Sequence, residues 1–176
     1  TSPFEAFLYM KGVRGVSITG SSFTYGQSTS PGSIVGYGYG IFATDAGFRV
    51  QSACNGNTYP CNDYTHTTFN NLGYAIYTAN VVGNQPFSVQ RARFNGCYFG
   101  IYNKSVSQGT LLFNVFNLGN VPDASLAQGQ YAQFGTFFEA AMSGFTFQEN
   151  TFQKIAGNVT NTVGSYSKDL AFFDGN

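Results

Sequence analysis

The sequence predicts an all-β fold, a parallel β-solenoid of about five coils. An alternating apolar strand, a later Phe and a triplet of Gly or Ala, Ile or Thr, and an aromatic residue recur in altered form along the chain. Val, Ile, Phe, Tyr and Thr dominate, and these residues favour pleated strands. No window has the i, i+3, i+4, i+7 apolar stripe of a helix. Self-similarity at a period of tens of residues is typical of repeat architectures.

The clearest copy of the repeat runs from Phe87 through Phe94 to the triplet Gly100-Ile101-Tyr102. From Phe87 to Gly109 is 109 − 87 = 22 residues, the shortest turn, and it contains three short extended pieces separated by Asn and Gly. Three strands per coil is the natural division. The apolar strand pairs of the five copies are Val16/Ile18, Phe48/Val50, Phe87/Val89, Gly109/Leu111 and Phe145/Phe147, the fourth being the weakest.

Coils that stack about 4.8 Å apart place equivalent side chains in columns. The Phe that follows each strand is therefore expected in one internal aromatic stack, of Phe23, Phe69, Phe94, Phe116 and Phe152. Asn70, Asn95 and Asn117 follow three of these residues and predict part of an amide ladder. Period-two alternation predicts that the residues between the apolar pairs face outward, namely Ser17, Arg49, Ser88, Thr110 and Thr146.

Coils longer than 22 residues carry three predicted loop insertions, within residues 24–39, 51–68 and 117–134. These insertions are rich in Ser, Gly, Gln and Asn, and loops of this kind often carry binding. Residues 7–9 match the triplet position, and residues 170–172 resemble the opening strand of a sixth coil. We recognise no capping element, so we expect residues 1–176 to form a single β-helix segment from a longer solenoid.

Only 9% of the residues are charged, with eight Lys and Arg against eight Asp and Glu. The basic residues are scattered, which excludes an electrostatic footprint for nucleic acid or anionic membrane. The one close basic pair, Arg91 and Arg93, fits a solvated strand end. No stretch is long and apolar enough for a spanning helix, so we expect no membrane insertion.

Cys54 and Cys61 bracket a turn-rich loop, and a disulfide between them in an oxidising compartment is our favoured interpretation. Cys97 is then left over as a buried small apolar residue. The alternative is a zinc site formed by Cys54, Cys61, His66 and Cys97, but the six-residue gap does not match the usual zinc knuckle.

Two segments, residues 94–102 and 145–152, resemble the repeats of right-handed parallel β-helix proteins of the pectate-lyase-like superfamily. The resemblance covers roughly residues 7–173 and implies a right-handed β-helix. The superfamily includes lyases, glycoside hydrolases and epimerases, and also adhesins without catalysis, so the fold does not decide the function. In its Phe-, Asn- and Gly-rich texture the chain is also similar to large secreted and surface proteins of gliding bacteria exported by the type 9 secretion system.

Sequence patterns typical of catalytic sites are weak in this chain. A glycosidase needs two carboxylates on one face, and stacking could bring Asp123 beside Glu139 or Glu149. A lyase of the pectate type would hold Ca²⁺ on acidic side chains of a strand face, whereas the outward columns here lack carboxylates. The single histidine, His66, fits polar loop surface. We therefore assign no catalytic, cofactor or metal residues.

We expect a non-catalytic stalk or adhesive module of a secreted or cell-surface bacterial protein. Its partners would be glycans, a surface or secretion partner protein, and further coils of the same polypeptide. Two alternatives stay open. One is a fragment of a carbohydrate-active enzyme, either a polysaccharide hydrolase or a lyase. The other is a cargo or subunit bound by a larger secretion or surface machine.

Overall fold

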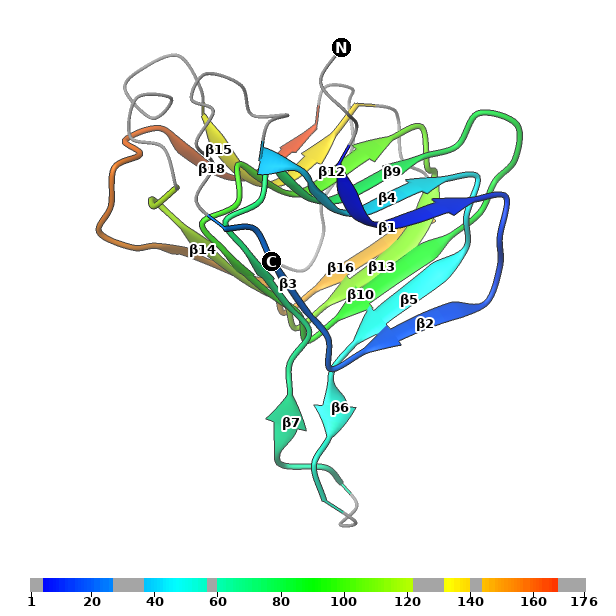
Figure 1. The fold of residues 1–176 in the computed structure, drawn as a ribbon, viewed down its shortest axis with the longest axis horizontal. Helices are drawn as coiled ribbons and strands as arrows, with labels where there is room; N and C mark the ends of the chain where they lie inside the picture. Colours follow the sequence, from blue (N-terminus) through cyan, green and yellow to red (C-terminus); the bar gives the residue numbers. More distant parts are fainter. Residues whose placement is uncertain (1–4, 27–36, 57–59, 122–131, 140–143, 168–176) are drawn as a thin grey trace.

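The computed structural model describes residues 5–26, 37–56, 60–121, 132–139 and 144–167, and in these residues the secondary structure is all β. Three parallel sheets wrap around one core (Figure 1). In each sheet, neighbouring strands come from successive coils. Each coil therefore contributes one strand to each of the three sheets, which we name A, B and C in chain order. The fold is a parallel β-solenoid, as the repeat predicts. Among the described residues, no helix is long and apolar enough to cross a membrane.

Sheets B and C have five strands each, and sheet A has six. Sheet A contains β1 (Ala6–Lys11), β4 (Tyr39–Thr44), β9 (Tyr74–Ala79), β12 (Phe99–Lys104), β15 (Gln133–Phe138) and β18 (Thr162–Ser167). Sheet B contains β2 (Val16–Thr19), β5 (Phe48–Gln51), β10 (Phe87–Gln90), β13 (Gln108–Leu112) and β16 (Gly144–Gln148). Sheet C contains β3 (Ser22–Thr24), β8 (Thr68–Asn70), β11 (Arg93–Asn95), β14 (Val115–Leu118) and β17 (Thr151–Lys154).

The register of the coils confirms the predicted alignment of the repeats. In sheet B, Phe87 pairs with Phe48 on one side and with Gly109 on the other. Gly109 leaves a gap in the core at the weakest copy, and the Phe145 ring fills it, at 5.5 Å from the Phe87 ring. Residue 109 is therefore in register, although as a glycine it contributes no side chain to the core.

The internal aromatic stack is confirmed along sheet C. Adjacent rings of the five-residue column lie nearly parallel, with centroids 4.5 to 5.0 Å apart, from Phe23 through Phe69, Phe94 and Phe116 to Phe152. The predicted amide ladder runs beside this stack. The Asn95 side chain donates a hydrogen bond to the Asn70 amide oxygen at 2.8 Å and accepts one from Asn117 at 2.7 Å.

Each inner strand of sheet A contains a four-residue pattern of aromatic, small, Ile or Thr, and aromatic residues, and the two central residues face the core. A Cβ built on Gly100 would lie 2.8 Å from the Phe116 ring, and Ile101 is fully buried. The flanking Phe99 and Tyr102 therefore both point outward, where their rings contact each other at 5.2 Å. The same pattern recurs at residues 39–42, 74–77 and 134–137, so sheet A has an aromatic outer face.

Buried amides stabilise the corners between the sheets. Asn103, between sheets A and B, bonds the main chain of Val106 in both directions. Asn114, between sheets B and C, accepts from the Ala92 N–H and donates to the Val89 carbonyl. A buried main-chain group without a partner costs about 1–3 kcal/mol, so these amides replace hydrogen bonds that a tight corner cannot make within a sheet.

Of the three predicted insertions, the second is described in most of its length. It contains an antiparallel hairpin of β6 (Ala53–Cys54) and β7 (Tyr64–Thr65) that projects from the solenoid (Figure 1). The predicted disulfide between Cys54 and Cys61 is present, and Cys97 is buried. Most of the other two insertions and residues 170–172 lie outside the described residues. Residues 7–9 occupy the predicted triplet position, since Leu8 pairs with Ile41.

Replacing Gly100 with Ala should destabilise the solenoid. The added Cβ would lie 2.5 Å from the Gly135 carbonyl oxygen and 2.8 Å from the Phe116 ring, so the backbone of two coils must shift. Overpacking of this kind costs about 1–3 kcal/mol, which a lower urea midpoint would report. The matched control is Gly83→Ala, whose Cβ would meet only a flexible glutamine side chain, at 3.5 Å. Equal midpoints for the two variants would contradict the tight stacking at Gly100.

Candidate functional site

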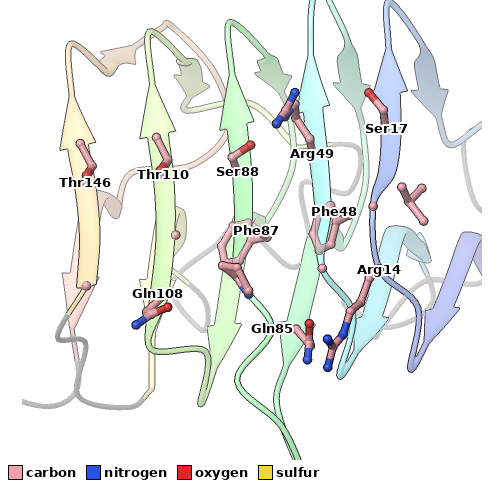
Figure 2. Close-up of a pocket in the computed structure, with 16 residues that line it drawn as sticks. Arg14, Ser17, Phe48, Arg49, Gln85, Phe87, Ser88, Gln108, Thr110 and Thr146 are labelled. Carbon is pink, nitrogen blue, oxygen red and sulfur yellow. The ribbon is translucent and has the colours of Figure 1, made fainter.

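The outer face of sheet B is hollowed into an open groove of about 670 Å³ that crosses all five strands (Figure 2). The predicted outward column forms a row along it, because residues of successive coils pair in register. The groove is lined by Arg14, Gly15, Val16, Ser17, Gly47, Phe48, Arg49, Gln85, Pro86, Phe87, Ser88, Gln108, Gly109, Thr110, Gly144 and Thr146.

Small residues at the beginning of the strands create the hollow. Gly15, Gly47 and Gly144 each precede an inward apolar residue of sheet B, so no side chain rises from the surface at these points. A Cβ on Gly47 would meet Gln85 and the Pro86 carbonyl at 3.5 Å, in the space that the groove now occupies. The groove was not predicted from the sequence, although the recurring glycine before the strand was a usable signal.

The groove presents hydroxyl and amide groups to solvent. Within the described part of the chain, the side chains of Ser88, Thr110 and Thr146 make no hydrogen bond with other residues. Gln85 and Gln108 add amides at the strand beginnings (Figure 2). These donors and acceptors are free to bind a polar ligand.

The charge of the groove is positive. Arg14 and Arg49 are exposed and line it, and no carboxylate of the described ranges does so. Arg14 lies in the segment just before β2, and Arg49 lies in the adjacent strand β5. In the sequence these arginines are scattered charges, because only the register shows that they share one surface.

The outer face of sheet A carries two parallel aromatic ladders. One contains Tyr39, Tyr74, Phe99 and Phe134, with centroids 4.8 to 5.3 Å apart. The other contains Tyr9, Phe42, Tyr77, Tyr102, Phe137 and Tyr166, at 4.7 to 5.7 Å. Rings of one ladder meet rings of the other edge-on, as at Tyr74 and Tyr102. The ring faces thus pack mainly against neighbouring rings, which leaves less ring face for stacking on a sugar.

The environment of this aromatic face disfavours ionised tyrosine. The pKa of Tyr74 is raised to about 12, first by burial and then by the neighbouring Tyr39, Tyr77 and Glu139. The pKa of Tyr102 is also raised, first by burial and then by its hydrogen bond to Glu139. Glu139 also lies 3.9 Å from Lys104 in an ion pair. The tyrosines of this face therefore stay uncharged through the physiological pH range.

His66 and Ser52 lie at the base of the hairpin, where they secure it to the solenoid. Ser52 Oγ lies 2.7 Å and His66 Nδ1 2.8 Å from the main-chain oxygen of Arg91. The Arg91 guanidinium lies over the rings of Tyr64 and Phe113, at 5.0 and 4.6 Å from their centres. Arg91 thus stands at the end of β10, as the sequence suggested, but it is half-buried and packs its guanidinium on two rings.

The cysteine and carboxylate candidates are not brought into one site. Cys54 and Cys61 are joined in the disulfide, and burial raises the pKa of the Cys97 thiol to about 12. Glu139 follows β15 of sheet A and precedes β16 of sheet B, whereas Glu149 follows β16. The two acids therefore lie beyond opposite ends of β16. Asp123 lies outside the described residues.

No protein-family model, curated protein or solved structure matches this chain. The groove of sheet B, the aromatic face of sheet A and the hairpin base are thus the features that bear on function. Of these, the groove has the unsatisfied polar groups and the concave shape that ligand binding requires.

Replacing Tyr74 with Phe should make the protein more resistant to alkali. The folded pKa of Tyr74 is about 12 against 10.0 for an ordinary tyrosine. The stability linked to this raised pKa is fully present below pH 10 and is lost as the pH rises through 12. Phe99 and Phe134 occupy the same column, so the Phe ring fits.

The measurement is the urea midpoint at pH 8 and at pH 11. Wild type should lose more stability between the two than Tyr74→Phe. Tyr64→Phe, on the hairpin, is the control and should behave as wild type. Identical losses for wild type and Tyr74→Phe would show that this phenol ionises freely in the folded protein.

Proposed function

We propose that the chain is a non-catalytic stalk or adhesive module of a secreted or cell-surface bacterial protein, and that the groove on sheet B binds a glycan. The observation that carries the proposal is the lining of the groove. Hydroxyls, amides and guanidinium groups from five successive coils face one concave surface, with no carboxylate among them. Such groups match the many hydroxyl and ring oxygens of a sugar chain.

The spacing of the groove suits an extended, repeating ligand. The outward column has one side chain per coil, and coils repeat about every 4.8 Å. Ser88 and Thr110 are adjacent members of this column, paired in register. A ligand that runs along the solenoid axis would therefore meet the same kind of polar contact at each step.

Rigidity supports binding by a groove of small hydroxyl residues. Ser17, Ser88, Thr110 and Thr146 have short side chains, so little rotamer entropy is lost when they bind. The strands beneath them are fixed by the coil register and by the apolar core. Preorganisation of this kind reduces the cost of binding, which matters when each hydrogen bond contributes about 1 kcal/mol.

The disulfide supports a location outside the cytoplasm. The hairpin exposes Cys54, and disulfides of this kind persist in oxidising compartments. The low charge content also departs from the usual composition of soluble domains. A bacterial source and export by the type 9 secretion system are proposed on the resemblance of the sequence alone.

A non-catalytic role is supported by the lining of the groove. A hydrolase would need two carboxylates about 5 to 9 Å apart across the bound sugar, and the lining residues include none. Glu139 pairs with Lys104, and among the described residues no carboxylate lines the groove to attack or protonate a ligand.

Replacing Thr110 with Trp should block the groove and abolish glycan binding. Thr110 lies in the outward row near the middle of sheet B, and an indole there would fill the hollow without entering the core (Figure 2). Binding is measured on a glycan array and then by calorimetry with the glycans that bind. The control is Thr151→Trp, an exposed position on the outer face of sheet C.

Wild type and Thr151→Trp should bind the same glycans, and Thr110→Trp should lose at least about 90% of the binding. Both variants should retain the wild-type circular dichroism spectrum. Undiminished binding by Thr110→Trp, or no binding by wild type, would contradict the proposal. Cleavage of a bound glycan by wild type would instead identify an enzyme.

A further inference from the structure

We infer that the sheet B groove selects anionic glycans, whose sulfate or carboxylate groups are bound directly by Arg14 and Arg49 without a bridging cation. This inference rests on the proposed function, because it names the ligand class for the same groove. It adds a requirement that hydroxyls and amides alone do not impose, namely negative charge on the ligand.

The two arginines lie on adjacent coils and line the same groove. Ser17 of β2 pairs in register with Arg49 of β5, and Arg14 stands three residues before Ser17. Arg14 also adjoins Gly47, since its Cα lies 4.0 Å from the position of a Cβ on that glycine. Both arginines therefore belong to the first two coils, and their guanidinium groups point apart, that of Arg14 toward the strand beginnings beside Gln85 and that of Arg49 toward the strand ends (Figure 2).

Neither arginine is neutralised within the described part of the chain. The one ion pair there joins Lys104 to Glu139, on sheet A. No ion pair or hydrogen bond of the Arg14 and Arg49 side chains is found among the described residues, and both are exposed. The groove is therefore locally positive although the whole chain has a formal net charge of zero.

The acids of the described residues lie elsewhere. None of them lines the groove; they are Glu5, Asp45, Asp63, Glu139 and Glu149. Asp45, the acid nearest in sequence to Arg49, accepts hydrogen bonds from the main-chain N–H groups of Val81, Val82 and Gly83. Its carboxylate is therefore engaged with the residue 81–83 loop.

Guanidinium groups suit sulfate and carboxylate oxygens. Arg presents several N–H donors in a planar fork, and its hydrogen bonds to anions are about twice as strong as those between neutral groups. The side-chain amide of Gln85, whose Oε1 adjoins Gly47, adds a neutral polar group beside Arg14 (Figure 2). Because no described carboxylate lines the groove, a bridging Ca²⁺ would have no charged ligand among the described residues.

The geometry also predicts how the ligand lies. Anionic groups of the ligand would be bound over the first two coils, one at Arg14 and another at Arg49, and the uncharged part of the chain would extend over Ser88, Thr110 and Thr146. Both arginines are exposed, so salt should weaken their attraction for the ligand strongly.

The experiment compares three oligosaccharides of equal length by calorimetry: an oligogalacturonate, a sulfated chondroitin oligosaccharide and a neutral cello-oligosaccharide. At about 50 mM NaCl, wild type should bind at least one anionic ligand about tenfold or more tightly than the neutral one. The affinity should fall steeply toward about 500 mM NaCl and should not change when EDTA is added. Preference between the sulfated and the carboxylated ligand identifies the source of the anionic group.

The double variant Arg14→Gln/Arg49→Gln should lose this preference and bind the anionic and neutral ligands alike. Arg93→Gln is the matched control, because Arg93 is exposed on the outer face of sheet C and lies outside the groove. It should retain wild-type affinity. Equal thermal midpoints for all variants would exclude misfolding as the cause of a loss, since each replaced side chain is exposed.

Three results would overturn the inference. The first is equal binding of neutral and anionic ligands by wild type, and the second is equal loss in Arg93→Gln and in the double variant. The third is loss of anionic binding in EDTA. If Thr110→Trp still abolishes binding in any of these cases, the proposed glycan site stands and only its charge selectivity fails. If Thr110→Trp binds every ligand as wild type does, the glycan site itself is wrong.

Discussion

The in-register stacking of successive coils is the constraint on which the rest of the structure depends. Main-chain hydrogen bonds of the three parallel sheets fix each coil on the next, and this register places Phe23, Phe69, Phe94, Phe116 and Phe152 in one column. Nearly parallel rings 4.5 to 5.0 Å apart then fill the core. The same register leaves no room for a Cβ where Gly100 faces Gly135. Sheet spacing thus determines which side chains are allowed inside.

Register also determines the outer faces, because any residue that recurs in the repeat becomes a row on the surface. On sheet A the recurring aromatic pair becomes two ladders that pack against themselves, and burial keeps their tyrosines protonated. On sheet B the recurring small polar residue becomes a row of hydroxyls beside a hollow. The two faces therefore have different chemistry. The outer face of sheet A is aromatic and packs against itself, whereas the outer face of sheet B is polar and open to ligand. Arg49 interrupts the hydroxyl row and brings positive charge to the second face.

Much of the fold was predictable from the sequence, because a column of identical residues needs only the period and the strand alternation. The Phe stack, the Asn ladder, the outward column and the Cys54–Cys61 disulfide were predicted and are present. The corner amides were not, since Asn103 and Asn114 have no distinctive neighbours in sequence and their partners depend on the three-dimensional turn. The groove was also missed. Arg14 lies before a strand and Arg49 within one, 35 residues apart (49 − 14), and only the pairing of β2 with β5 shows that they lie on adjacent coils of one surface.

Disulfide trapping of the coil register tests the central claim most directly. Ser88 pairs with Thr110 on the outer face of sheet B, and Leu112 lies on the same face two residues further along the strand. In-register Cα atoms about 4.8 Å apart are within disulfide range, whereas atoms more than about 7 Å apart are not. Stacked coils predict rapid cross-linking on oxidation of Ser88→Cys/Thr110→Cys and little in Ser88→Cys/Leu112→Cys. Preferential cross-linking of the second pair, or equal cross-linking of both, would contradict the register and the surfaces derived from it.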